Sequence, residues 1–244
     1  MLSEYVLVSV LIPNFNYGRF ISETVRSVEK QDYENIELII VDDGSKDDSI
    51  SVIEEITKET KSRFKRVRTI YSKENKGVNN AINEGMKLVE GKVTIILDSD
   101  DTLLPEYVSR QTSLLLENEP ESVGFVYSNT WLMDKDGKVL DQGLSNEFDP
   151  ELLQTESYLP GCGATLTRVL REVLPLDVKI KTATKVKRWR GIVSNGYRGL
   201  HIPEPLFHYR MHDDNISGIG LKILDEHQNG RINNPMLKGY WAPH

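Results

Sequence analysis

The first hundred residues alternate between two hydrophobic periods, and this alternation restricts the folds that the chain can adopt. Nearly continuous apolar runs at 6–12, 36–41, 67–71 and 93–97 are typical of buried strands. Between these runs, apolar residues recur at helical spacing over 21–28, 50–56 and 78–89, with Asp47 placed to cap the second helix. Strands that alternate with helices predict an α/β fold with a mostly parallel sheet flanked by helices.

After Pro105 the pattern is less regular. It predicts helices at 108–116, 168–173 and 186–193, a strand at 123–127 and a hairpin turn at 134–137. Pro203 and Pro205 predict that a strand over 202–209 lies at an edge or is interrupted. We expect residues 1–104 to form one half of a merged domain, 105–212 a smaller second half, and 213–244 a C-terminal extension.

Charge and composition exclude several classes of protein. The net charge is −7, which argues against a protein that coats nucleic acid, and the single cysteine excludes an intrachain disulfide or a cysteine-rich zinc site. No basic stretch precedes an apolar segment at the N-terminus, and no apolar run approaches the ~20 residues that span a bilayer. We therefore expect a cytoplasmic protein, with peripheral contact to the inner face of a membrane as a further possibility.

Polar residues follow three of the predicted strands at the point where each strand ends. They are Pro13-Asn14-Phe15-Asn16, Asp42-Asp43 and Asp98-Ser99-Asp100-Asp101. Ligands of open α/β sheets bind outside the carboxyl ends of the strands, so these segments are expected to share one site. Taken singly, such residues are also common as turn residues and helix caps.

The predicted edge carries at least four carboxylates, which repel one another unless a cation or a hydrogen-bonding partner compensates. Hard oxygen ligands favour Mg²⁺ or Mn²⁺, and these ions are typically held by one or two carboxylates together with substrate phosphates. The sequence therefore predicts a divalent metal here. No Walker loop or GxGxxG motif occurs at the expected place, which argues against an ATPase or a dinucleotide site.

The order and spacing of these motifs resemble the family 2 glycosyltransferases over about the first 105 residues. The resemblance is carried by Val8–Asn16, Ile39–Ser45, Asn75-Lys76-Gly77 and Leu97–Asp101. It implies the GT-A fold, in which a nucleotide-binding sheet merges with an acceptor-binding half. It also implies transfer of a sugar from a nucleotide-sugar to an acceptor hydroxyl, with inversion.

The resemblance also implies roles for individual residues. Asp98-Ser99-Asp100 is similar to the DXD signature, with Asp100 on the metal and Asp98 near the ribose or the metal. The nucleotide-sugar contacts would be made by Pro13, Asn14, Phe15, Asn16, Asp42, Asp43, Asn75, Gly77, Asp98 and Ser99.

The second half contains weaker matches. Pro203–His212 is similar to a segment near the end of the family's domain and suggests His212 as a metal or diphosphate contact, although a surface histidine beside Asp213 and Asp214 is an equal alternative. The loop with Gly161, Cys162 and Gly163 stands where the family places the floor of the acceptor pocket, and Cys162 is read as a small buried residue. Lys185 and Arg210 complete the acceptor-side candidates, with Arg210 pairing with a phosphate or with a nearby acid.

One departure concerns the general base that an inverting transfer requires. Where the family usually carries an acidic pair, this chain has Thr184-Lys185, and Asp177 is the nearest upstream acid. The stretch 179–190 carries six basic residues instead. Three interpretations remain open. In the first, Asp177 or another acid serves as the base, and in the second, the basic stretch binds a phosphate or carboxylate of an acidic acceptor. In the third, the protein binds the donor without transferring the sugar efficiently. A solvated basic face is the structural alternative.

The leading hypothesis is a metal-dependent glycosyltransferase that uses Mn²⁺ or Mg²⁺ and a nucleotide-sugar, with UDP-sugar as the favoured donor and a glycan or lipid-linked acceptor. The alternative is a non-catalytic or weakly active nucleotide-sugar-binding partner subunit, because of Thr184-Lys185. A nucleotidyltransferase is a third hypothesis, but Asn14-Phe15-Asn16 stands where its glycine-rich basic segment is expected.

Overall fold

The first half of the chain is a parallel sheet with its helices. The computed structural model describes residues 6–181 and 183–215 of the 244 residues. The strands of this half are β1 (Val8–Asn14), β2 (Ile36–Asp42), β3 (Arg66–Tyr71) and β4 (Val93–Ile96). Its helices are α1 (Gly18–Glu29), α2 (Ser49–Thr60) and α3 (Val78–Met86), and a short 3₁₀ turn follows α2 at Lys61–Arg63.

The second half adds shorter elements to the same sheet. Its strands are β5 (Thr102–Leu103), β6 (Val123–Met133), β7 (Val139–Gly143), β8 (Ala164–Leu166) and β9 (Arg198–Arg210). Its helices are α4 (Tyr107–Glu117), α5 (Pro150–Thr155), α6 (Thr167–Glu172) and α7 (Thr184–Ser194), with a 3₁₀ turn at Glu119–Glu121.

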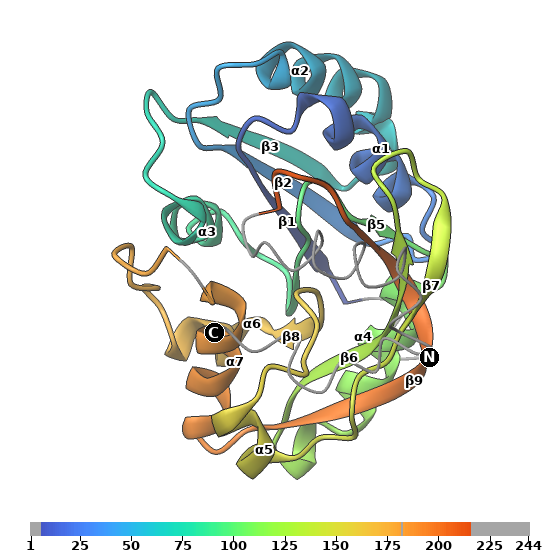
Figure 1. The fold of residues 1–244 in the computed structure, drawn as a ribbon, viewed down its shortest axis with the longest axis vertical. Coiled ribbons are helices and arrows are strands. Elements are labelled where there is room, and N and C mark those ends of the chain that lie inside the picture. The colour runs from blue at the N-terminus through green and yellow to red at the C-terminus, as the bar shows by residue number, and fades with distance from the viewer. Residues whose placement is uncertain (1–5, 182, 216–244) are drawn as a thin grey trace.

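The described strands form one sheet in the order β3-β2-β1-β4-β8-β6-β9-β5, with β7 paired to β6 (Figure 1). β1 pairs in parallel with both β2 and β4, whereas β8 enters antiparallel between β4 and β6. The two halves of the chain therefore share one sheet. This architecture confirms the predicted α/β class.

The core follows from the continuous apolar strands. Every residue of β1, β2 and β4 is buried, which requires cover on both faces of the sheet. Helix α3 packs on β1 and β2, and Gly85 allows this close approach because a Cβ there would lie 3.1 Å from Val41 Cγ2. Helices α1 and α2 pack against each other elsewhere on the sheet (Figure 1).

Asp47 joins the starts of two helices, which extends its predicted role as a cap. Its Oδ1 accepts a hydrogen bond of 3.1 Å from the Ser49 amide at the start of α2. Its Oδ2 accepts one of 3.0 Å from the Gly18 amide at the start of α1. A single carboxylate thus satisfies one free amide of each helix.

The two prolines of β9 are accommodated where the pairing is irregular. The parallel register with β6 shifts on both sides of Asn129, opposite Pro203 and Pro205. On its other side, among the described strands, β9 pairs only with β5, at Phe207 and His208, so the proline-containing stretch lies at an edge of this sheet. The element is nevertheless one strand, longer than the 202–209 that the sequence predicted.

The remaining expectations for the second half can be placed directly. The 134–137 turn joins β6 and β7 as a hairpin, and Gly137 has a φ of +85° there. Among the described residues, no helix is long and apolar enough to cross a membrane. Most of the predicted C-terminal extension, residues 216–244, lies outside the described residues.

Candidate functional site

The three polar segments predicted to share a site follow adjacent strands. Asn14 is the last residue of β1 and pairs in register with Asp42, the last residue of β2. On the other side of β1, the Leu97 amide donates a hydrogen bond of 2.9 Å to the Leu11 carbonyl, so β4 delivers Asp98 to the same edge. The carboxyl ends of three parallel strands therefore meet here, as the topology of an open α/β sheet requires.

Asp42 is fully buried and organises the loop behind this edge. Its Oδ2 accepts hydrogen bonds from Asn14 Nδ2 at 2.9 Å and from Ser45 Oγ at 2.6 Å, and its Oδ1 accepts one from the Ser45 amide at 2.9 Å. Ser45 Oγ also accepts a hydrogen bond of 2.8 Å from the amide of Asn16, which has a φ of +56°. Asp42 thus fixes the 13–16 loop, on which Pro13 is buried while the Phe15 ring is exposed.

Asp43 is also buried, but only one of its two oxygens is used. Its Oδ2 accepts hydrogen bonds from the amides of Lys76, at 2.9 Å, and Gly77, at 2.6 Å. Within the part of the chain that the structure describes, Asp43 Oδ1 has no hydrogen-bond partner, and the same holds for Asn14 Oδ1 and Asn79 Oδ1. Burial raises the pKa of the Asp43 carboxyl, although hydrogen bonds from the Gly77 and Lys76 amides and from the Asn80 side chain oppose that change. An unsatisfied buried acceptor is costly unless a ligand supplies the donor.

Gly77 is a backbone requirement of this site. It has a φ of +98° directly before α3, and a Cβ there would lie 2.9 Å from Lys181 Nζ. Lys181 Nζ in turn donates a hydrogen bond of 2.9 Å to the Lys76 carbonyl. Asn75 is exposed on the same loop.

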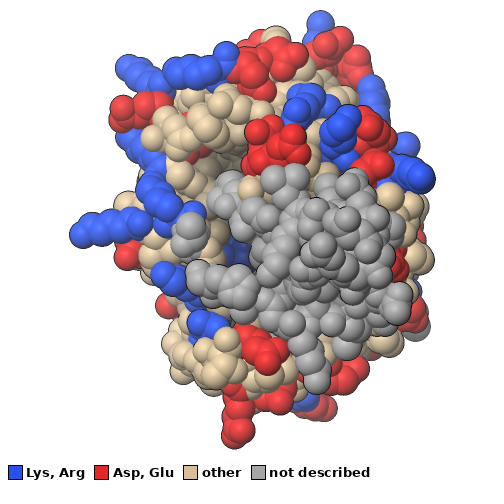
Figure 2. Space-filling model, viewed as in Figure 1, with Lys and Arg blue, Asp and Glu red and all other residues tan. Residues whose placement is uncertain are grey.

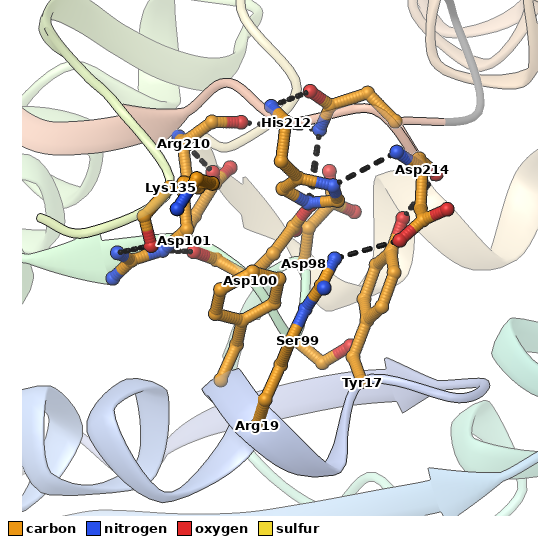
Figure 3. A network of polar contacts seen from close by, with 12 residues as sticks. Tyr17, Arg19, Asp98, Ser99, Asp100, Asp101, Lys135, Arg210, His212 and Asp214 are labelled. Atoms are coloured by element: carbon orange, nitrogen blue, oxygen red, sulfur yellow. Dashed lines mark hydrogen bonds and ion pairs between the residues drawn. The ribbon is translucent and has the colours of Figure 1, made fainter. Parts of the chain in front are cut away.

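Three carboxylates gather after β4. Asp98, Asp100 and Asp101 each offer an oxygen, and these oxygens lie within 4.8 Å of one another (Figure 3). Asp101 is buried, and burial, together with the charges of Asp100 and Asp98, raises its pKa well above the ordinary range. The buried Ser99 holds the segment to α1, because its carbonyl accepts a hydrogen bond of 2.9 Å from Thr24 Oγ1.

His212 contacts this cluster, which excludes the surface histidine as an alternative, whereas its role as a metal or diphosphate contact stays a prediction. The ring is 2% exposed, and Nε2 is 3.0 Å from Asp100 Oδ2 (Figure 3). Nδ1 accepts a hydrogen bond of 3.1 Å from the Asp214 amide, so in a neutral ring Nε2 carries the proton and donates to Asp100. Tyr17 and Phe20 pack on the ring, with centroid distances of 5.2 and 4.8 Å. His212 is not a surface histidine.

Arg210 hydrogen-bonds to the segment that carries Asp100 and Asp101. Its amide donates to Asp101 Oδ1 at 3.0 Å, and its Nε donates to the Asp100 carbonyl at 2.8 Å. Nη2 forms an ion pair with Glu23 at 2.5 Å, and the side chain is 2% exposed. These contacts place Arg210 inside the protein, whereas its acceptor-side role stays a prediction.

Lys185, on α7, contacts the same carboxylate cluster as Arg210 and His212. It lies in the first turn of α7, and its Nζ forms an ion pair with Asp98 Oδ2. Burial lowers the pKa of this lysine, but the charges of Asp98 and Asp101 raise it by more. Lys185, which the sequence predicted on the acceptor side, thus forms an ion pair with a residue of the predicted metal site.

The stretch 179–190 does not form one solvated basic face. Lys179 and Lys187 are exposed, but Arg188 is buried and donates to the Gly161 carbonyl at 3.0 Å. Arg190 Nε donates to the Leu153 carbonyl at 2.7 Å. Figure 2 shows Lys and Arg side chains spread down the left side of this face of the molecule.

The loop with Gly161, Cys162 and Gly163 is packed tightly against α7 and α4. Cys162 is 1% exposed, and its Sγ accepts a hydrogen bond of 3.0 Å from the Tyr107 hydroxyl. A Cβ at Gly163 would lie 2.8 Å from the Val126 carbonyl oxygen. Small residues are needed here for packing, and contact with an acceptor stays a prediction.

Asp177, the candidate base, lies on an exposed loop that is docked on α3. Its carbonyl accepts a hydrogen bond of 2.8 Å from Asn79 Nδ2, and its Oδ1 accepts one of 2.9 Å from the Lys179 amide. Within the described residues, no hydrogen bond or ion pair joins it to the Asp98 cluster. Its catalytic role stays a prediction.

The side chains at this edge fit a hard divalent ion. The cluster supplies three carboxylate oxygens that lie within 4.8 Å of one another, and oxygen is the ligand atom that Mg²⁺ prefers. Asp98, Asp100 and Asp101 form an acidic cluster that could bind a metal. The metal-ligand roles predicted for Asp98, Asp100 and His212 stay predictions, as does the identity of the ion.

Several contributors to the site were not predicted. Asn215 Nδ2 donates to Asp100 Oδ2 at 3.2 Å, and the Tyr17 hydroxyl donates to the Asp214 carbonyl at 2.7 Å. Glu23 meets Arg210 from 187 positions away in the sequence. Tyr17 follows directly on the Asn14-Phe15-Asn16 motif, which was a usable signal, whereas Glu23 has no local signal.

Comparison with known proteins shows which family the chain belongs to. A model described as Glycosyl transferase family 2 matches residues 9–169. The chain is 30% identical over 223 residues to the glycosyltransferase alr2836 of Nostoc sp., covering 85% of this chain and 66% of that relative. It is 28% identical over 218 residues to TuaG of Bacillus subtilis, a glycosyltransferase named for teichuronic acid biosynthesis, covering 86% and 81%.

A further relative is WfgD of Escherichia coli, named as a UDP-Glc:alpha-D-GlcNAc-diphosphoundecaprenol beta-1,3-glucosyltransferase. It is 27% identical over 242 residues, covering 96% of this chain and 90% of the relative.

Solved structures with GT-A sheets share the fold. TarS of S. aureus in complex with UDP-GlcNAc superposes with a TM-score of 0.67 at 18% identity, covering 86% of this chain and 60% of that one. The mannosyltransferase PcManGT of Pyrobaculum calidifontis, in complex with GDP-Man and Mn²⁺, gives a TM-score of 0.67 at 16% identity, covering 94% and 65%. With the family model spanning residues 9–169 of the 244, the chain belongs to glycosyl transferase family 2.

Proposed function

We propose that this protein is a metal-dependent glycosyltransferase that transfers a sugar from a UDP-sugar to an acceptor hydroxyl, with inversion, during the synthesis of a polysaccharide or other glycan. The observation that carries this proposal is the meeting of Asp43 and the Asp98–Asp100 segment at one sheet edge, in a chain of family 2. TuaG and WfgD support a role in glycan synthesis, and TarS supports a UDP-sugar donor.

The division of labour follows from the contacts. The unpartnered oxygens of Asp43 and Asn14 accept hydrogen bonds from the base and ribose, which orients the donor. Asp98 and Asp100 would hold the divalent ion, which would supply charge stabilisation to the diphosphate leaving group. His212 would join them if its Nε2 gave up the proton that it donates to Asp100. Arg210 keeps the Asp100 carbonyl and the Asp101 carboxylate in place.

The acceptor proton requires a separate group, because Thr184 and Lys185 provide no carboxylate. Asp177 is the base candidate on the α7 side of the chain. Loss of a positioned base costs roughly 10²- to 10⁴-fold in rate, so the Asp177→Asn variant tests this role directly. Retention of full turnover by that variant would exclude Asp177.

A thermal-shift titration with UDP, GDP and UDP-sugars, with and without Mn²⁺, tests the donor site. The matching nucleotide raises the melting temperature of the wild-type chain, because a ligand that binds the folded state stabilises it. Asp100→Ala abolishes the Mn²⁺-dependent part of that increase. Equal donor affinity with and without Mn²⁺, in both proteins, would contradict the metal-dependent mechanism.

A second candidate function is a partner subunit that binds nucleotide-sugar without efficient transfer. The observation in its favour is Lys185, which occupies the expected base position and pairs with Asp98. Slow hydrolysis of UDP-sugar by the purified protein favours the enzyme. Tight donor binding without turnover across a panel of glycan and lipid-linked acceptors favours the partner subunit.

We place the protein in the cytoplasm, with peripheral contact to the inner face of the membrane. The support is the lipid-linked acceptor in the name of WfgD and the exposure of Lys179 and Lys187 beside the site. Liposome binding that rises with anionic lipid content is the expected result. Binding that ignores anionic lipid would contradict the membrane contact.

A further inference from the structure

The position of Lys185 assigns it a role that the family resemblance does not supply. The family usually carries an acidic residue at this place, but here the side chain is a cation and forms an ion pair with Asp98. The two residues lie 87 positions apart, on α7 and directly after β4. A carboxylate of the predicted metal site is therefore already matched with a positive charge from the protein.

The surrounding structure guides Lys185 to this position. Gly161 leaves the space that the lysine side chain fills, because a Cβ there would lie 2.7 Å from Lys185 Cδ and 2.8 Å from Cε. The helix that carries Lys185 is fastened to the same loop, since Arg188 donates to the Gly161 carbonyl at 3.0 Å and Trp189 Nε1 donates to the Pro160 carbonyl at 2.9 Å. Each contact limits the freedom of Lys185 to swing away.

Each carboxylate of the cluster has its own partner. Asp98 pairs with Lys185, Asp100 accepts from His212 and Asn215, and Asp101 accepts from the amide of Arg210. Of these partner groups only the Lys185 ammonium is a cation, and it is paired with Asp98. An incoming divalent ion must therefore displace the lysine from Asp98 or bind beside its positive charge.

We propose that Lys185 is a resident cation of the donor site that competes with the divalent ion for Asp98. It follows that the ion binds weakly to the protein alone. A nucleoside diphosphate relieves this competition, because its phosphates offer Lys185 another anion and leave Asp98 free. Metal and nucleotide binding are then coupled through one side chain. The inference rests on the proposed donor site, since it takes Asp98 as a metal ligand.

The test is a titration with Mn²⁺ alone, followed by the electron paramagnetic resonance signal of the free ion. The Lys185→Met variant keeps the aliphatic stem and loses the charge. It is expected to bind Mn²⁺ about tenfold more tightly than the wild-type chain, because a like charge has been removed from beside the ion. Saturating UDP is expected to reduce that difference to less than about threefold.

Two further variants keep the result interpretable. Gly161→Ala leaves the charge in the chain but crowds the lysine stem, so it is expected to tighten Mn²⁺ binding in the same direction. Lys187→Met removes an exposed charge from the same helix and is the matched control, with unchanged affinity expected. Circular dichroism of each variant confirms that the chain is folded.

The outcomes separate the inference from the proposed function. Mn²⁺ affinity in Lys185→Met that is equal to or below that of the wild type overturns the competition, as does a Lys187→Met effect of equal size. Failure of UDP and GDP to bind any variant, with or without Mn²⁺, overturns the proposed donor site, while the titration with Mn²⁺ alone still decides whether Lys185 opposes the ion.

Discussion

The Gly77 amide donates a 2.6 Å hydrogen bond to Asp43 Oδ2, which ties the end of β2 to the start of α3. The Lys76 amide donates to the same oxygen at 2.9 Å, while Asp43 Oδ1 is buried without a partner. One oxygen of this carboxylate therefore maintains the fold and the other is free for a ligand. A substitution at this position separates the two roles.

Asp43→Asn is expected to weaken nucleotide binding but to relieve an unfavourable buried charge. Burial raises the pKa of Asp43, so the folded state holds its proton more tightly than the unfolded state. The free energy of unfolding of the wild type should therefore fall relative to that of the variant as pH rises. The fall begins near about pH 4, the ordinary carboxyl pKa, and is complete above the raised pKa of the folded state. Urea denaturation of both proteins between acid and neutral pH measures the difference. A pH-independent difference would contradict the raised pKa.

Asp47→Ala is expected to lower the free energy of unfolding by about 1–2 kcal/mol, because the carboxylate accepts from the first amides of both α1 and α2. Burial acts to raise the pKa of Asp47, but hydrogen bonds from Ser49 and Gly18 lower it on balance. The stabilisation is thus present above the unfolded pKa and is lost as pH falls through the folded pKa. Asp48→Ala is the control, since Asp48 occupies the N-cap without a side-chain capping bond. Equal losses in both variants would argue against the bridge.

The parts of the fold that could be predicted are those with a local signal. β2 and α4 were placed within about two residues, because continuous burial and helical spacing are visible in the sequence. β5 and β8 were not predicted, since strands of two and three residues show no period. β9 was underestimated because irregular pairing with β6 accommodates Pro203 and Pro205, which no local rule reveals.

The site divides in the same way. Asp42, Asp43 and Asp98 were identifiable because they end strands, and the ends of adjacent parallel strands converge. The pairs that set their electrostatics join distant segments, as in Lys185 with Asp98 and Arg210 with Glu23. These pairs depend on how α7 and β9 pack on the first half, and residue spacing carries no information about that packing.

Arg210→Met is expected to destabilise the protein by about 1–3 kcal/mol, because it leaves the buried Asp100 carbonyl without its donor. Its ion-pair partner Glu23 is 58% exposed and stays solvated. The guanidinium also lies 5.0 Å from the centre of the Phe20 ring. Arg198→Met removes an exposed ion pair with Glu121 and should cost less than about 1 kcal/mol. Urea denaturation gives both values, and a similar small loss in the two variants would show that Arg210 is not a structural brace.

Cys162 is expected to resist thiol reagents until the protein unfolds. The thiol is 1% exposed, and burial raises its pKa to about 12, although the Tyr107 hydroxyl hydrogen bond acts in the opposite direction. The reactive thiolate is therefore scarce at pH 8, and the reagent has no direct access to the sulfur. Reaction with a chromogenic disulfide should be at least about 100-fold slower in buffer than in 6 M guanidinium, where the thiol has an ordinary pKa of about 8.5. Rapid reaction of the folded protein would instead show that the 161–163 loop opens onto a solvent-filled acceptor pocket.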